Sequence, residues 1–597
     1  MAWSLFLPVA SAVTVTSTAG GMWTNGAIWD SGLPPASGDS VVIAAGHTVT
    51  IDRASANLDS LTCNGGLVFS GWHTVITAVT ATINGTVTHL PQSATTTNAA
   101  GEWVADNRIW IVCTDLTVAA GASINADACG YVGPTPSGSP IQGRGPGGGK
   151  VSDWAGGGGH GGQGGRAGNN TSGGAPYGSV AAPGDPGSSG GSAYNYSSGA
   201  KAGNGGGVIR IEALGTVTVN GTLSANGADG PGASYTSGAG SGGSIFITCA
   251  SFAGSGMVRA AGGSCQVFNA LGRGGAGSGG RIAIIYDPAA QDSRPIPTAI
   301  IDAGGGLGGP PPYQYAEPGS VYLTDTRFLS QTNIISANMC VYFRDSTNWA
   351  GGSLLVTNCW VRFPSNFPFQ CNGDLVLAGA SAKLEFCEPA FVACSNLIVT
   401  NSGRLYLYAG MTNGIEEDWG GLVAVSGIVC VASNSTIYPY SHASNGGSMK
   451  FTVTSLVVEQ GGVIDANAKG FRGNFADKKG YGPGGGIASG YGSGAGYGGA
   501  GGRDGRNNAG GPTYGSSNAP VDPGSVGGNG HPYDGGPSGG GLIRVEASSI
   551  RVDGTLTADG QSDSPSDYGG GGSGGGIYLI AETMGGAGQL RACGGSG

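Results

Sequence analysis

The chain of 597 residues has few charged side chains, no cluster of basic residues and no long apolar run. Asp, Glu, Lys and Arg make up 10% of the sequence, and the formal net charge is −10. Without a Lys/Arg cluster there is no basic surface for a nucleic acid, so we expect no such partner. No apolar run reaches the roughly 18 residues that a membrane helix needs, so we expect no membrane span.

Closely paired cysteines and helical periodicity are also lacking. The 12 cysteines include no pair separated by two residues, which argues against a zinc site or a thioredoxin-like motif. Several lie in strand-like contexts and are expected to be small buried side chains. The alternative is disulfides in an oxidising compartment, with Cys387 and Cys394 as the candidate pair. Frequent Val, Ile and Thr without helical patterning predict an all-β chain.

Glycine is abundant and placed in a repeated order. It supplies 123 of the 597 residues, against a usual share of about 7%. Residues 161–187 align without a gap on residues 498–524, a constant shift of 337 positions (498 − 161 = 337). The absence of a Gly-X-Y period excludes collagen, and a linker would keep composition without keeping positions. The match therefore predicts a duplicated, ordered unit.

Short strands separated by corners recur along the chain. Residues 82–88, 218–224 and 551–557 share one sequence pattern, in which Asn-Gly or Asp-Gly separates two β-branched stretches. Such a pair alone is typical of a two-residue hairpin. The regular succession of three- to five-residue strands favours the corners of a β-solenoid instead. The predicted fold class is all-β: an elongated parallel β-solenoid, or β-helix, with two duplicated glycine-rich insertions.

The duplication divides the chain into four expected regions. These are an N-terminal cap with the first coils over 1–115, a first repeat over 116–290 with an insertion at about 130–206, a central solenoid over 291–455, and a second repeat over 456–597 with an insertion at about 470–541. Extended glycine strands approach closely enough to hydrogen-bond one another, which predicts a polyglycine-II-like lattice. The second copy stops in mid-repeat, so we expect either a fragment of a longer protein or an open coil that a partner completes.

The N-terminal residues 23–29, 32–52 and 58–69 resemble the start of G8-like β-helical modules, which open many secreted and surface proteins. The sequence segments 205–213, 240–247 and 279–286 are similar to segments of very large glycine-rich surface proteins of environmental bacteria. These resemblances imply an extracellular or cell-surface β-solenoid. They supply no catalytic residues.

Two groups of polar residues are candidates for chemistry. Glu416, Glu417 and Asp418 precede a tryptophan, and carboxylates beside an aromatic ring suit a glycan-cleaving site. The alternative for them is a solvated loop between coils. Gly-x-Gly-x-x-Gly strings abound, but no predicted helix follows them, so we expect no nucleotide cofactor.

Residues near the entrances of the glycine insertions are candidate metal ligands. Asp127, Asp465 and Asn467 would take calcium, although Asn and Asp at corners are commonly turn formers. We expect no other cofactor.

Two charge pairs are predicted on strands. Arg210 lies two residues before Glu212, and Arg544 lies two residues before Glu546, so each pair shares one side of a strand. We expect both pairs to be exposed.

Tyrosines occur at intervals within the glycine insertions. Tyr177, Tyr491, Tyr497 and Tyr514 are candidates for self-association or for contact with surface glycans. The resemblances above imply an extracellular location, and with the predicted solenoid they favour a structural protein and not an enzyme: a subunit of a surface fibre, stalk or adhesin that assembles end to end. The alternative is a glycan-binding or glycan-cleaving β-helix such as a phage-like tail spike.

Overall fold

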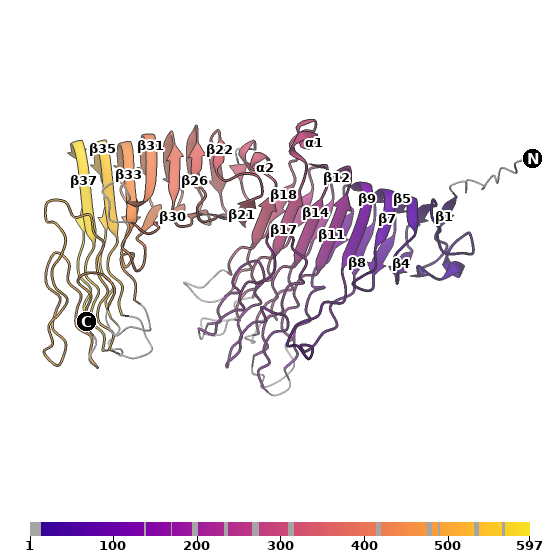
Figure 1. Cartoon of the computed structure of the whole chain (residues 1–597), viewed down its shortest axis with the longest axis horizontal. Helices are drawn as coiled ribbons and strands as arrows, with labels where there is room; N and C mark the ends of the chain where they lie inside the picture. Colours follow the sequence, from indigo (N-terminus) through magenta and orange to yellow (C-terminus); the bar gives the residue numbers. More distant parts are fainter. Residues whose placement is uncertain are drawn as a thin grey trace, which may run out of the picture. The chain divides into compact units, whose positions relative to one another are not determined.

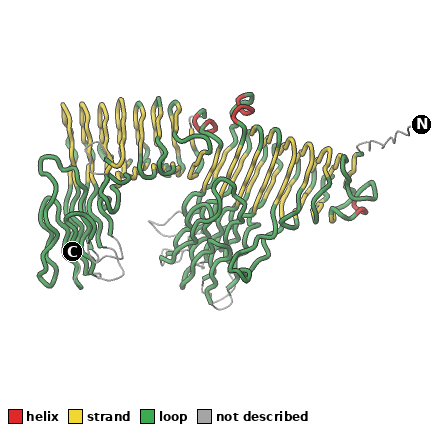
Figure 2. Tube along the Cα trace, viewed as in Figure 1, coloured by secondary structure: helices red, strands yellow, loops and turns green. Residues whose placement is uncertain are grey.

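The computed structural model describes residues 13–136, 139–168, 170–193, 201–231, 237–265, 274–308, 316–332, 334–412, 419–473, 480–487, 490–530, 536–563 and 568–597. The chain forms two compact units, Met1–Phe328 with Ala337–Asp345, and Leu329–Ser336 with Ser346–Gly597. In each unit, short strands stack coil upon coil, and long segments without strand structure extend from one edge of the stack (Figures 1 and 2). The parallel β-solenoid is confirmed.

The first unit contains two principal parallel sheets. The first pairs, in order, β1 (Thr14–Thr16), β3 (Ser40–Ile43), β5 (Asn57–Cys63), β7 (Ile76–Ile83), β9 (Ile109–Val118), β11 (Val208–Ala213), β14 (Ser244–Thr248), β17 (Arg281–Ile285), β19 (Ser320–Leu323) and β21 (Met339–Phe343). From the second half of β9 it continues into β12 (Thr216–Val219) and β15 (Ser251–Ala253). The second pairs β2 (Gly21–Met22), β4 (Thr48–Ile51), β6 (Gly66–Phe69), β8 (Thr86–His89), β10 (Ser123–Asn125), β13 (Thr222–Ser224), β16 (Met257–Arg259) and β18 (Ile300–Asp302).

The second unit repeats this arrangement with three rows of strands. One row is β22 (Trp349–Gly351), β25 (Phe369–Cys371), β28 (Phe391–Cys394), β31 (Gly420–Val431), β33 (Ser448–Val458), β35 (Leu542–Val552) and β37 (Gly576–Gly585). A second row pairs, in order, β20 (Ile334–Ile335), β23 (Leu354–Thr357), β26 (Asp374–Ala378) and β29 (Asn396–Thr400). Its last strand, β29, pairs with β31, where this row meets the first. The third is β24 (Trp360–Phe363), β27 (Lys383–Phe386), β30 (Arg404–Tyr408), β32 (Thr436–Tyr440), β34 (Val463–Asp465), β36 (Thr555–Thr557) and β38 (Gln589–Arg591). Within the described ranges, the helices are short: η1 (Gly26–Ile28), α1 (Pro288–Asp292) and α2 (Arg327–Ser330).

The Asn-Gly pairs form solenoid corners and not hairpins. Strands β7 and β8 flank Asn84 and Gly85, yet β7 pairs with β5 and β9 while β8 pairs with β6 and β10. The Asn84 side chain donates to Asn64 Oδ1 of the preceding coil at 2.9 Å. A Cβ atom on Gly85 would lie 2.0 Å from the carbonyl oxygen of Gly65. Glycine is thus required because successive corners stack in close contact.

The core of each unit is a column of inward side chains that repeats from coil to coil. In the first unit, Val41, Leu61, Ala81 and Leu116 are in register on β3, β5, β7 and β9, and each is at most 1% exposed. β-branched and leucine side chains suit this position because they alternate with outward residues along each short strand. Stacking therefore buries a continuous apolar interior that no single coil could form.

No disulfide joins any two of the twelve cysteines, and nine of them, including Cys63 and Cys113, are buried. The predicted disulfide between Cys387 and Cys394 is therefore wrong. Cys394 ends β28 with its side chain buried, whereas Cys387 follows β27 in a different row of strands. Most of the cysteines act as small apolar side chains, as predicted.

Candidate interaction surface of the glycine bundles

The glycine segments of the first unit form a hydrogen-bonded bundle beside the solenoid (Figure 2). The amides of Gly157, Gly158 and Gly159 donate to carbonyls of three different segments, at residues 165, 239 and 147, over 2.8–3.0 Å. An extended helix with three residues per turn directs successive amides in three directions. A β-strand in a sheet does not, because its amides bond only to the two neighbouring strands. The same succession recurs over residues 238–243, so the bundle is the predicted polyglycine-II-like lattice.

Glycine is required at most positions inside the bundle. A Cβ atom on Gly174 would lie 1.7 Å from the carbonyl oxygen of Gly147, and one on Gly240 would lie 1.8 Å from that of Asn204. Because the obstructing atoms belong to hydrogen-bonded backbone, they cannot rotate away as a side chain would. The bundle also extends beyond the insertion expected at about 130–206, since it includes segments 237–243 and 274–280.

In each bundle, a tyrosine hydroxyl bonds to a proline carbonyl and to a serine hydroxyl further along the chain, and so holds the intervening segment folded back on itself. We call this arrangement the tyrosine–serine latch. The Tyr177 hydroxyl donates to the Pro186 carbonyl at 2.5 Å and accepts from Ser188 Oγ at 2.9 Å. Tyr514 repeats the latch with Pro523 and Ser525 at the same two distances. Burial raises the pKa of both tyrosines well above 10, so the hydroxyls remain protonated donors.

The ring beside the latch differs between the units. In the first unit the His160 ring packs on Tyr177, with centroids 4.7 Å apart, and its Nδ1 lies 2.8 Å from the Gly242 carbonyl oxygen. In the second unit Tyr497 takes the aligned position and packs on Tyr514, also at 4.7 Å. This correspondence was not among the expectations from the sequence, because the residue aligned with His160 is a different aromatic residue, Tyr497. The common shift of 337 positions would have found it (497 − 160 = 337).

Two buried histidines make the first unit sensitive to acid. Burial lowers the pKa of His89 from 6.5 to about 4, and burial with the nearby charge of Arg281 lowers that of His160 to about 3. At these two sites the unfolded chain binds more protons than the folded chain below pH 6.5, so their contribution to stability falls as pH falls from 6.5 toward 4. Each unit of pKa shift corresponds to about 1.4 kcal/mol.

We expect the denaturant midpoint of the first unit to drop steadily between pH 7 and pH 4, measured by urea unfolding with circular dichroism. The variant His73→Gln changes an exposed histidine and is the matched control, which should keep the same slope. A midpoint independent of pH in this window would contradict the burial of neutral histidines.

The predicted acidic candidates fall in three places along the chain. Glu416, Glu417 and Asp418 lie outside the described residues. The Asp127 carboxylate accepts from the amide of Asn226 at 2.6 Å, which joins two consecutive corners. Across the described part of the chain, no group of three His, Cys, Asp or Glu side chains is placed to hold a metal ion.

The corner at Asp465 and Asn467 is likewise engaged in local bonds. Asp465 Oδ1 accepts from Lys469 Nζ at 3.2 Å and from the Asn467 amide at 2.8 Å. Asn467 Oδ1 accepts from the amide of Asp559 at 2.6 Å. These bonds fasten one corner to the next coil.

One predicted charge pair is exposed and the other is not. Arg210 pairs with Glu212 and remains about a third exposed, as expected. Arg544 is only 7% exposed, which contradicts the expectation for it. Its guanidinium lies 3.5 Å from the centre of the Trp419 ring, and it donates to Glu546 at 3.1 Å. The difference arises because Trp419 covers this face of the second unit.

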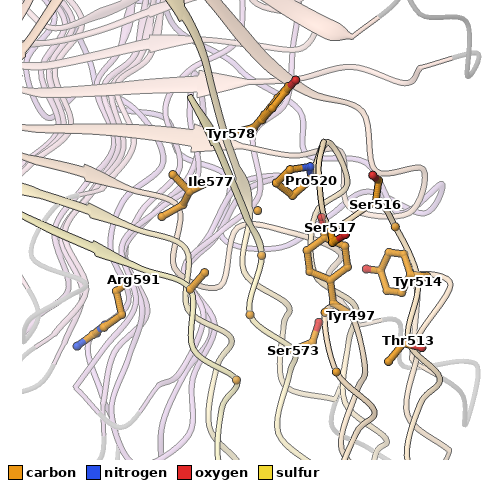
Figure 3. A pocket seen from close by; sticks show the side chains of 18 of the residues that line it. Tyr497, Thr513, Tyr514, Ser516, Ser517, Pro520, Ser573, Ile577, Tyr578 and Arg591 are labelled. Atoms are coloured by element: carbon orange, nitrogen blue, oxygen red, sulfur yellow. The ribbon is translucent and has the colours of Figure 1, made fainter. Parts of the chain in front are cut away.

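A cavity of about 1320 Å³ opens beside the last coil of the second unit. Its lining includes Tyr497, Tyr514, Ser573, Tyr578 and Arg591, and Figure 3 shows the first two rings side by side on its wall. Among described residues, β37 pairs only with β35 and β38 only with β36, so one edge of each strand is unpaired. The structure thus brings two of the four predicted tyrosines together at an open sheet edge.

The other two predicted tyrosines do not line this cavity. Tyr177 closes the latch of the first unit, and Tyr491 is 36% exposed on the second bundle. The Arg506 guanidinium lies 5.1 Å from the centre of the Tyr491 ring. A surface ring of this kind is available to a partner or a sugar.

No described helix is long and apolar enough to cross a membrane.

Comparison with known proteins gives one family, at the N-terminus. Neither a curated protein nor a solved structure matches the chain. Residues 28–89 match the G8 domain, and this span contains strands β3 to β8 of the first coils. The expected G8-like N-terminal module is therefore confirmed over these residues.

Proposed function

We propose that the protein is an extracellular structural subunit of a surface fibre, stalk or adhesin, and that it extends end to end through β37 and β38. The observation that carries this proposal is the duplicated glycine lattice with its identical tyrosine latches. Glycine strands present backbone and almost no side chains. The interior of the bundle therefore holds few groups that could act on a substrate, whereas its hydrogen bonds make it rigid. Two copies on two solenoid stacks suit a load-bearing body.

The open edge supports assembly. Ile580, Met584 and Leu590 are 43%, 57% and 48% exposed at the last coil. An unpaired edge with exposed apolar side chains is a template for another strand, and association at such an edge is head to tail. The β1 edge differs, because Asp30 accepts from the Thr16 amide and donates its own amide to the Thr16 carbonyl. A head-to-tail contact with β1 therefore requires this loop to move.

Negative-stain electron microscopy and light scattering of the purified full chain test the proposal. We expect filaments or a ladder of oligomers for the wild type, and loss of both in Ile580→Lys, because a charge on the edge face opposes strand addition. Leu214→Lys is the matched control, since Leu214 is an 84% exposed apolar residue of the first unit. A wild type that stays monomeric at high concentration would contradict end-to-end assembly.

Glycan binding is the second candidate, and a row of stacked tyrosines favours it. Tyr406 packs on Tyr438 with centroids 4.6 Å apart, and Tyr408 packs on Tyr440 at 4.7 Å. All four rings are half-buried on β30 and β32, and flat aromatic faces suit sugar rings. Binding to immobilised polysaccharides, weakened by Tyr438→Ala and without turnover of the polymer, would support a glycan-binding role; turnover would support the enzyme alternative.

A further inference from the structure

We propose that the outward side of β24, β27, β30, β32 and β34 binds a polysaccharide that carries carboxylate or sulfate groups. We call this surface the basic tyrosine face. It includes the four stacked tyrosines of β30 and β32 and belongs to the second unit (β30 is labelled in Figure 1). The inference rests on the second candidate function above, because it names the class of glycan that these rings would contact.

Positive charges outnumber negative charges on the basic tyrosine face. The carboxylates of its described residues are Glu385 and Asp465, against five cations, which leaves an excess of three positive charges (5 − 2 = 3). The cations are Arg362, Lys383 and Arg404 on the strands, with Lys469 and Arg472, which follow β34 and lie over the rings. The whole chain has a net charge of −10, so the sign reverses on this face. A polyanion is attracted here and repelled by the chain as a whole.

Two of the cations lie directly opposite each other. Lys383 on β27 and Arg404 on β30 are register partners, and like charges at such positions repel. Lys383 also shares the carboxylate of Glu385 with Arg362, and that carboxylate is only 3% exposed. No carboxylate of the described residues pairs with Arg404, which is exposed. An anionic group bound between Lys383 and Arg404 would relieve their repulsion.

The lysines of this face extend the stack of aromatic rings. Lys383 Nζ lies 3.5 Å from the centre of the Trp360 ring and 4.7 Å from that of Tyr406. At the other end of the stack, Lys469 Nζ lies 5.0 Å from the centre of the Tyr438 ring. These cation–π contacts hold the ammonium groups in line with the rings. A chain-like ligand that crosses the strands would therefore meet aromatic and charged groups together.

An acidic polysaccharide fits this combination of groups. The five strands lie about 4.8 Å apart, so the face extends over roughly 20 Å across the coils, which is long enough for several sugar units. Tyrosine hydroxyls both donate and accept hydrogen bonds, as sugar hydroxyls do, and ammonium and guanidinium groups bond strongly to carboxylate or sulfate. A nucleic acid offers phosphates but few hydroxyl groups, so we favour the polysaccharide.

Surface plasmon resonance of the full chain on immobilised polymers tests the charge requirement. We expect saturable binding to alginate, which carries carboxylates, or to dextran sulfate, which carries sulfates; the polymer that binds identifies the anionic group. Dextran has the backbone of dextran sulfate without its charge and should not bind. Raising the ionic strength to about 0.5 M should weaken binding at least about tenfold, because salt screens exposed charges.

A charge reversal at Arg404 tests the location of the site. Arg404→Glu should weaken binding to the charged polymer about tenfold, since it removes a charge-assisted bond and repels the polymer. Arg404→Lys keeps the charge and should bind nearly as the wild type does. The melting temperature of Arg404→Glu should not fall, because the exposed side chain no longer opposes Lys383. Arg551→Glu is the matched control: Arg551 lies on β35 of the same unit with a 69% exposed side chain, and its variant should bind normally.

The outcomes separate this inference from the proposed functions. Equal binding to dextran and dextran sulfate would overturn the acidic class and leave glycan binding in place. Equal losses in Arg404→Glu and Arg551→Glu would show that the basic tyrosine face is not the site. A single-stranded oligonucleotide that binds as tightly as the charged polysaccharide would contradict the choice of ligand. Filaments formed by a chain that binds none of these polymers would overturn the inference and leave the structural role standing.

Discussion

Gly240→Val is expected to destabilise the first unit by about 3 kcal/mol, the upper end of the usual cost of overpacking, because hydrogen-bonded backbone must shift to make room for the side chain. The Cβ atom would lie 1.8 Å from the Asn204 carbonyl oxygen and 2.8 Å from the amide nitrogen of Gly205. Relief of that overlap moves the Gly240 strand, whose amide donates to Ala228 at 2.9 Å. Neighbouring lattice bonds would then break together.

Guanidinium unfolding of the full chain, followed by far-UV circular dichroism, measures this effect. Gly184→Val is the matched control, since it lies in the same unit with nothing within 4 Å of its Cβ position, and its midpoint should stay at the wild-type value. If the two variants unfolded at the same midpoint, the packing of the lattice described above would be wrong.

Phe363→Ala is expected to cost the second unit about 3–5 kcal/mol, the usual range for removal of a large buried aromatic side chain. Phe363 is 0% exposed and stacks on Phe386, with centroids 5.3 Å apart. Trp349 and Phe369 contact its other sides at 5.6 and 5.3 Å. The cavity left behind cannot collapse easily because the surrounding rings are anchored on the paired strands of two successive coils.

The same unfolding assay measures this loss, and Phe391→Ala provides its control. Phe391 is a 42% exposed phenylalanine on β28 of the same unit, so its removal should cost under about 1 kcal/mol. Equal losses in the two variants would contradict the aromatic core.

Local sequence patterns predicted the fold because the solenoid is built from local rules. The alternation on β3 and β5 placed Val41 and Leu61 inside, and Asn-Gly corners recur because stacked corners leave no room for a Cβ atom. The gap-free match of two glycine passages predicted an ordered lattice, and the hydrogen bonds of Gly157 to Gly159 show it.

The candidate surface was less predictable, because it depends on contacts between distant segments. Arg544 looked exposed from its spacing to Glu546, but Trp419 from another coil covers it. The tyrosine latch needs a serine eleven positions away whose role appears only when the hairpin folds back.

Amide hydrogen exchange of residues 156–168 in the intact protein tests the central claim most directly. If the glycine passages form the lattice, the amides of Gly157, Gly158 and Gly159 should exchange at least about a thousandfold more slowly than those of an unfolded peptide of the same sequence. Exchange at the rate of the unfolded peptide would contradict an ordered glycine bundle, and with it the structural role proposed for the protein.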